Sequence, residues 1–73
     1  MNPKYLVIEL QTNADGTVGN IVTAHDALNE AESKFHQVLA AAAVSALPIH
    51  AAVLLRSDGA LLERRDYRHG EAV

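Results

Sequence analysis

The chain has 73 residues, a net charge of −3 and no cysteine. This length allows one small domain, the absence of cysteine excludes disulfides and thiolate metal sites, and the negative charge argues against non-specific nucleic-acid binding. Apolar residues make up 49% of the chain, but no apolar run approaches the roughly 20 residues that span a bilayer. We therefore expect one domain over residues 1–73, no signal peptide, no membrane association and a cytoplasmic location.

The first predicted element in chain order is a hairpin. Residues 4–11 (KYLVIELQ) are rich in β-branched and apolar types, which indicates a buried central strand. The turn formers of residues 12–16 (TNADG) follow, and Gly16 can take the positive φ of a type I turn with a bulge. Residues 17–24 (TVGNIVTA) then predict the returning strand, in which Gly19 indicates a bulge or a close backbone approach.

A strongly amphipathic helix is predicted over residues 26–47. Asp26 is the expected N-cap, and Pro48 ends the helix because it lacks an amide proton and disfavours helical angles in the residue before it. Apolar residues recur at steps of three and four and form one stripe, which suits one face of a sheet. The stripe contains Leu28, Ala31, Phe35, Val38, Leu39, Ala42 and Ala46.

A second hairpin closes the chain. Residues 49–57 (IHAAVLLRS) and 60–67 (ALLERRDY) predict two strands, and Asp58-Gly59 predicts a two-residue turn between them. Residues 68–73 predict a polar tail that frays.

These elements predict an α+β fold with the order ββαββ. A helical crossover normally makes the strands that it joins parallel, so the third strand runs with the second and against the first. The result is a four-stranded antiparallel sheet in the order 2-1-3-4 with one helix packed on one face, and the order 1-2-4-3 is the alternative.

Both faces of this sheet carry large apolar residues, and one helix covers only one face. We expect the uncovered face or the alanine-rich half of the helix to bind a second copy of the chain, which makes the protein a homo-oligomer, most simply a dimer. Another protein is a further candidate partner, bound through the free face or an exposed edge strand. The alternative is a monomer with scattered exposed leucines. The residues predicted for the interface are Val7, Leu54, Leu61 and Tyr67.

No catalytic or metal-binding constellation appears in the sequence. Glu32 and His36 share one helix flank, but they supply only two ligands, and His50 could approach His69 across the last hairpin. The serines lack the glycine context of a nucleophile elbow. We therefore expect no enzyme activity, no cofactor and no metal.

Arginines gather near the end of the chain and give a second functional reading. Arg64, Arg65 and Arg68 could contact a nucleic-acid backbone, which would make the protein a nucleic-acid-associated regulator. However, Arg64 and Arg65 point to opposite faces of a strand, and the sheet lacks the paired aromatics that stack bases. The alternative is a charged edge strand that discourages sheet aggregation.

Three stretches resemble a family of short proteins from bacteriophage and mobile-element regions of gut bacteria. They are residues 12–20 (TNADGTVGN), 31–36 (AESKFH) and 38–45 (VLAAAAVS), and the likeness extends from Tyr5 to about Leu55. That family has no assigned activity, so the resemblance implies only a small accessory protein. Together with the composition, it favours a non-enzymatic protein-interaction module that self-associates.

Overall fold

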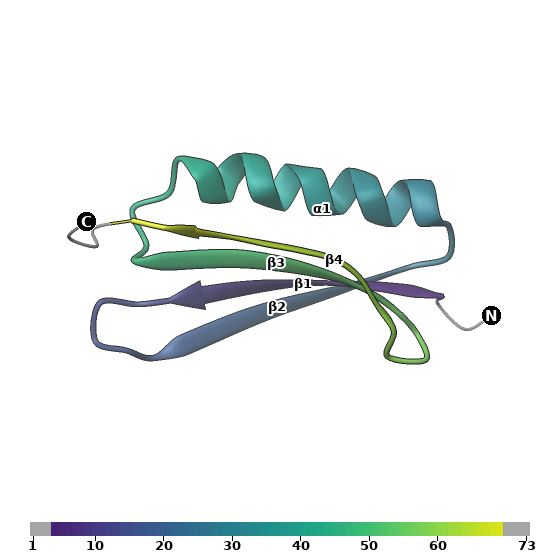
Figure 1. Cartoon of the computed structure of the whole chain (residues 1–73), viewed down its shortest axis with the longest axis horizontal. Coiled ribbons are helices and arrows are strands. Elements are labelled where there is room, and N and C mark those ends of the chain that lie inside the picture. Colours follow the sequence, from purple (N-terminus) through teal and green to yellow (C-terminus); the bar gives the residue numbers. More distant parts are fainter. Residues whose placement is uncertain (1–3, 70–73) are drawn as a thin grey trace.

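The computed structural model describes residues 4–69, which form one sheet and one helix (Figure 1). In chain order the elements are β1 (Tyr5–Thr12), β2 (Val18–His25), α1 (Leu28–Ala43), β3 (Ile49–Arg56) and β4 (Leu61–Arg68). The sheet has four strands in the order β2-β1-β3-β4, and every neighbouring pair is antiparallel. This confirms the predicted ββαββ architecture and the strand order 2-1-3-4.

The helix is shorter than predicted at both ends. It begins at Leu28 after the N-cap Ala27, which makes no side-chain cap hydrogen bond, so the prediction of Asp26 as the N-cap is wrong. It ends at Ala43 rather than Leu47, because Val44 leaves helical angles and the amides of Val44 and Ser45 bond back three residues instead of four.

Both hairpins close with the same turn. The amide of Gly16 donates to the carbonyl of Asn13, and the amide of Gly59 donates to the carbonyl of Arg56, each at 2.9 Å. The two glycines have φ values of +89° and +91°, as a type I turn followed by a bulge requires. The prediction for Gly16 is confirmed, whereas the two-residue turn predicted at Asp58-Gly59 is wrong.

The carboxylates before these glycines explain why the turns match. Asp15 accepts from the amide of Thr17, and Asp58 accepts from the amide of Ala60, so each side chain holds the bulge in place. Gly19 needs no such freedom: it pairs regularly with Gln11, has no positive φ, and would meet no atom within 4 Å if it carried a Cβ.

The core lies between α1 and one face of the sheet. Phe35 is the large helical side chain in this core, and it packs with Val7 and Leu54, each only 1% exposed. Alanines at the other contact positions bring the helix close to β3 and β1, on which it mainly packs. The buried apolar residues of the cluster are Val7, Ala31, Phe35, Val38, Ala52 and Leu54.

Arg68 and His69 are more ordered than the sequence predicts. Arg68 is the last residue of β4, and the amide of His69 donates to the carbonyl of Pro48 at 2.7 Å. The predicted frayed tail therefore does not begin at Arg68, and its residues 70–73 lie outside the described part of the chain. Within residues 4–69, no helix is both long and apolar enough to cross a membrane.

Candidate functional site: the open face of the sheet

The face of the sheet away from α1 is the largest apolar surface that the fold leaves uncovered. Side chains alternate between the two faces of a strand, so the residues between those that touch the helix point the other way. We call this surface the open face. It contains Leu6, Ile8, Leu10 and Thr12 of β1, Val18, Asn20, Val22 and Ala24 of β2, Ile49, Ala51, Val53 and Leu55 of β3, and Leu61, Arg64, Asp66 and Arg68 of β4.

Residues that lie side by side across the four strands form rows on the open face, and the rows nearest the β3–β4 turn consist mainly of apolar residues. Ile8 lies between Val22 and Val53, and Arg64 ends this row on β4. The next row places Leu6 and Leu55 beside Leu61, which is 54% exposed. In the Ile8 row, Val22 on the other edge of the sheet is 53% exposed. Figure 1 shows that α1 covers only the opposite side of the sheet, so no element of residues 4–69 shelters these side chains.

Charged residues border the open face along β4. Arg64 and Arg68 lie on either side of Asp66 and form ion pairs with it at 3.5 and 3.0 Å. All three groups are partly exposed. This arrangement gives the apolar surface a polar rim on one side, as protein interfaces usually have.

The four predicted interface residues do not share a face. Val7 and Leu54 are buried under α1, so their assignment to the free face is wrong. Tyr67 is half-buried on the same side, because its partner across the strands is the buried His50. Leu61 is the one that lies on the open face, opposite Leu55.

The predicted arginine cluster is split by the sheet. Arg65 lies on the helix side, where its guanidinium is 5.2 Å from the centre of the Tyr67 ring. Arg56 pairs with Asp58 at 2.9 Å, which raises the pKa of the arginine and lowers the pKa of the aspartate, mainly through their hydrogen bond. The arginines therefore serve intramolecular contacts and do not form one basic patch.

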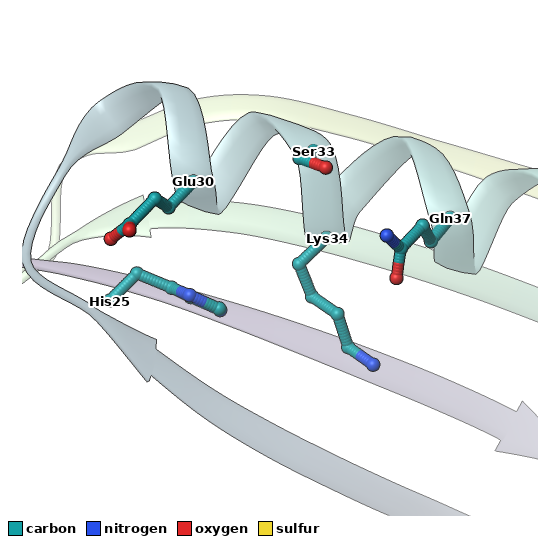
Figure 2. A pocket seen from close by; sticks show the side chains of 5 residues that line it. All are labelled: His25, Glu30, Ser33, Lys34 and Gln37. Carbon is teal, nitrogen blue, oxygen red and sulfur yellow. The ribbon is translucent and has the colours of Figure 1, made fainter.

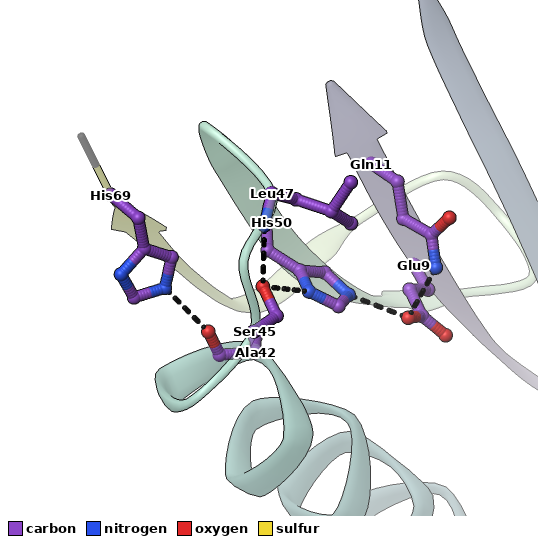
Figure 3. Close-up of polar contacts among 7 residues, drawn as sticks. All are labelled: Glu9, Gln11, Ala42, Ser45, Leu47, His50 and His69. Atoms are coloured by element: carbon purple, nitrogen blue, oxygen red, sulfur yellow. Dashed lines mark hydrogen bonds and ion pairs between the residues drawn. The ribbon is translucent and has the colours of Figure 1, made fainter. Parts of the chain in front are cut away.

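A buried polar chain links three segments at the far end of α1 (Figure 3). His50 is 4% exposed, and its Nε2 lies 2.6 Å from Glu9 Oε2 while its Nδ1 lies 2.9 Å from Ser45 Oγ. An ionised carboxylate only accepts, so Nε2–H donates to Glu9, while Nδ1 and the Ser45 hydroxyl share the second hydrogen bond. Gln11 donates to the same Glu9 oxygen at 2.9 Å.

The electrostatics of Glu9 follow from these contacts. Burial by itself raises the pKa of the Glu9 carboxyl. The hydrogen bonds from Gln11 and His50 and the charges of His50 and Lys34 together lower this pKa by more than burial raises it, so the net shift is downward. Glu9 is therefore ionised in the folded protein at neutral pH. The polar residues Glu9 and Gln11 within an otherwise apolar strand were the sequence signal for this network, which the sequence reasoning missed.

Ser45, His50 and Glu9 have the residue types of a hydrolase triad, but their surroundings differ from those of one. A triad needs an accessible serine beside a substrate site and donors aimed at the oxyanion. Here Ser45 Oγ accepts from the amide of Leu47 at 3.4 Å, and the groove described below does not include Ser45. The arrangement instead ties the connection between α1 and β3 to β1.

His69 contacts the end of the helix. Its Nε2 donates at 2.8 Å to the carbonyl of Ala42 in the last turn of α1, which also accepts from the amide of Ser45. Its ring also stacks on Tyr67 at 6.3 Å. His50 and His69 thus bind different groups, and no cluster of three or more potential metal ligands occurs within residues 4–69.

A shallow groove of about 400 Å³ lies between α1 and β2 (Figure 2). It lies where α1, which packs mainly on β3 and β1, makes fewer contacts with the sheet. The lining is polar: His25 comes from the end of β2, and Glu30, Ser33, Lys34 and Gln37 come from the helix.

Comparison with known proteins gave no match to a family model, to a curated protein or to a solved structure. The resemblance to short phage-associated proteins therefore stays a prediction from the sequence.

Proposed function

We propose that this protein is a non-enzymatic interaction module that self-associates by packing the open face against the open face of a second copy. The observation that carries the proposal is the distribution of apolar residues over the two faces of β1. The helix covers Val7 together with the polar Glu9 and Gln11, whereas Leu6, Ile8 and Leu10 point away from it.

This distribution is the reverse of what a monomer needs. A free monomer gains most when its single helix covers the more apolar face, because buried apolar area contributes about 25 cal/mol per Å². The uncovered face here carries Leu6, Ile8 and Leu10 of β1 and Ile49 and Leu55 of β3, whereas the helix covers Val7 and Leu54. A second covering layer would make burial complete on both sides of the sheet.

The area of the open face is sufficient for a stable dimer. Each strand has eight residues, so at about 3.3 Å per residue and about 4.8 Å per strand the face measures roughly 26 by 19 Å. Two such faces bury on the order of 1,000 Å² together, which is the lower bound for a specific interface. The partner is a second copy because identical faces match in size, and two sheets can pack at about 10 Å with their side chains interdigitated.

Light scattering on substituted chains tests the proposal. Leu61→Asp places a charge on the open face at a residue that is 54% exposed, so the fold tolerates it. We expect the mass of this variant to be half that of the wild type at the same concentration, because the carboxylate would have to be buried without a partner. Ile8→Asp, at the centre of the face, should have the same effect.

Val44→Asp is the matched control. Val44 is also an exposed apolar residue, at 85%, but it lies just after α1 and away from the open face. Its substitution should leave the mass unchanged. The proposal fails if Leu61→Asp and Val44→Asp, both folded by circular dichroism, have the same mass as the wild type.

A further inference from the structure

The two edges of the sheet have opposite character. β4 is charged at five of its eight positions, which are Glu63, Arg64, Arg65, Asp66 and Arg68. β2 reads VGNIVTAH and contains no aspartate, glutamate, lysine, arginine or proline. Natural sheets protect an edge with charges, proline or short length, so β4 is guarded against another strand and β2, with eight residues, is not.

The backbone groups that β2 presents to solvent can be assigned from the first hairpin. The amide of Asn13 donates to the carbonyl of Thr17, and bonded pairs alternate with non-bonded pairs along an antiparallel ladder. The residues of β2 that face β1 with their N–H and C=O groups are therefore the odd-numbered ones. Those directed away from β1 are Val18, Asn20, Val22 and Ala24.

Ile21 marks the same edge from the helix side. It lies opposite Glu9, on the face that α1 packs against, yet it is 50% exposed, and α1 packs less on β2 than on β1 or β3. The groove between α1 and β2, to which β2 contributes His25, lies on the same side of the sheet (Figure 2). Ile21 lies on the helix side, so packing of two open faces would leave it exposed, and only a different contact could bury it.

We propose that β2 pairs antiparallel with β2 of a second copy about a two-fold axis, with Ile21 lying opposite its own copy. This register keeps the helix sides of both sheets on one side. It matches Val18 to Ala24 and Asn20 to Val22 through their outward backbone groups. It also buries the two Ile21 side chains against each other in a non-bonded pair, where cross-strand side chains approach most closely.

The partner is a second copy rather than a strand of another protein because β2 matches itself. It is uncharged along its whole length, and its outward donors and acceptors repeat with the same spacing in both directions. The edge pairing stands independently of the open-face contact. Its two-fold axis is perpendicular to the sheet, whereas the axis of the face contact lies parallel to it.

The two contacts together close a tetramer, and this step rests on the proposed function. Edge pairing joins two four-stranded sheets, and the continuous open face of each pair then packs on that of another pair. The helices of all four chains lie on the outer surfaces of this assembly. In this assembly the two two-fold axes intersect at right angles, which gives closed symmetry, so growth stops at four chains rather than continuing into a fibre.

Asn20→Pro tests the edge pairing. Asn20 pairs with Leu10 at a position whose amide points to solvent, so proline removes a donor to the second copy without removing one from the β1–β2 ladder. We expect light scattering and native mass spectrometry to show half the wild-type mass for Asn20→Pro. Asn20→Ala keeps the amide and removes the same side chain from the open face, so the difference in mass between Asn20→Ala and Asn20→Pro reports the loss of the amide alone.

Combining variants separates the two interfaces. Leu61→Asp alone should also halve the mass, and Leu61→Asp with Asn20→Pro should give the 7.8 kDa monomer. Amide exchange at Val22 should be slow in the wild type and fast in Asn20→Pro. The edge pairing is overturned if Asn20→Pro folds and keeps the wild-type mass, or if Val22 exchanges freely in the purified wild type, which would leave β2 free for another protein. Failure of Leu61→Asp alone to lower the mass would overturn only the open-face contact.

Discussion

At the scale of single residues, the Glu9–His50 hydrogen bond and its continuation to Ser45 tie three segments of the fold together. Glu9 and His50 connect β1 to β3, and through Ser45 they hold the chain that follows α1. A buried polar chain of this kind is stabilising only when each member has its partner. No buried side-chain nitrogen or oxygen in residues 4–69 is without one.

Replacing Glu9 should make stability depend on pH in a particular direction. The folded pKa of Glu9 lies below its ordinary value of 4.5, so the ionised carboxylate stabilises the fold above that pH and the contribution is lost as the pH falls through the folded pKa. Glu9→Gln should cost about 1.5–3 kcal/mol at pH 7, the range for a hydrogen bond to a charged group. Urea unfolding at several pH values should show this difference shrinking below pH 4.5. A difference that stays constant down to acid unfolding would contradict the ionised network.

The glycines give a second residue-scale prediction. Gly59→Ala should destabilise the fold by about 1–2 kcal/mol, because a Cβ is unfavourable at the left-handed φ of this turn, whereas no steric clash contributes. Gly19→Ala should be neutral or stabilising by up to about 1 kcal/mol, since Gly19 has no positive φ and has open space around it. Thermal unfolding of the two variants measures the difference, and equal melting temperatures would argue against the turn assignment.

At the scale of elements, the sequence predicts which segments pair but not which face the helix covers. Periodicity and turn residues are local signals, so the two hairpins, the helix and the strand order follow from them. The covered face depends on how α1 and the connection to β3 meet the sheet, and this includes the Ser45–His50–Glu9 contact over 41 residues of sequence. Both sets of alternate residues on β1 contain large apolar side chains, so alternation alone could not decide between them.

The open face consequently could be predicted in kind but only partly in its residues. Leu61 was placed correctly, and Val7 and Leu54 were not, because their neighbours Leu6 and Leu55 fit either face equally well by type. The turn between β3 and β4 has three residues and therefore places Leu61 rather than Leu62 opposite Leu55. The bulge between Leu54 and Leu55 then restores the pairing of Leu54 with Glu63 that a two-residue turn would give. A pattern of apolar and polar residues does not reveal such a shift.

Truncating a leucine on each face tests this assignment. Leu54→Ala should destabilise the chain by about 2–5 kcal/mol, because it opens a cavity in the core under α1. Leu61→Ala should change the stability of the dilute, dissociated chain by no more than about 0.5 kcal/mol, since this side chain is half-exposed. Denaturant titration at low protein concentration compares them, and equal losses would mean that the faces are assigned wrongly.

At the scale of the whole molecule, one helix and one sheet leave an apolar layer without cover. A chain of 73 residues without cysteine has few internal means of adding to its stability. The proposed association would supply a second layer against the open face, and the proposed pairing at β2 would cover the edge of the described sheet that has no aspartate, glutamate, lysine or arginine. The charged β4 remains as the outer edge.

Stability should consequently rise with protein concentration. Because association stabilises only the folded chain, the melting temperature should increase as the concentration is raised, and Leu61→Asp should flatten this dependence. Differential scanning calorimetry over a hundred-fold range of concentration measures it. A wild-type melting temperature that is the same throughout would mean that folding and association are not linked.

The most direct test of the central claim is the mass of the unmodified protein in solution. Light scattering over a concentration series should give a multiple of the 7.8 kDa chain at high concentration, dissociating toward a single chain on dilution. A mass of 7.8 kDa at every concentration would contradict the claim that the open face is an interface between copies.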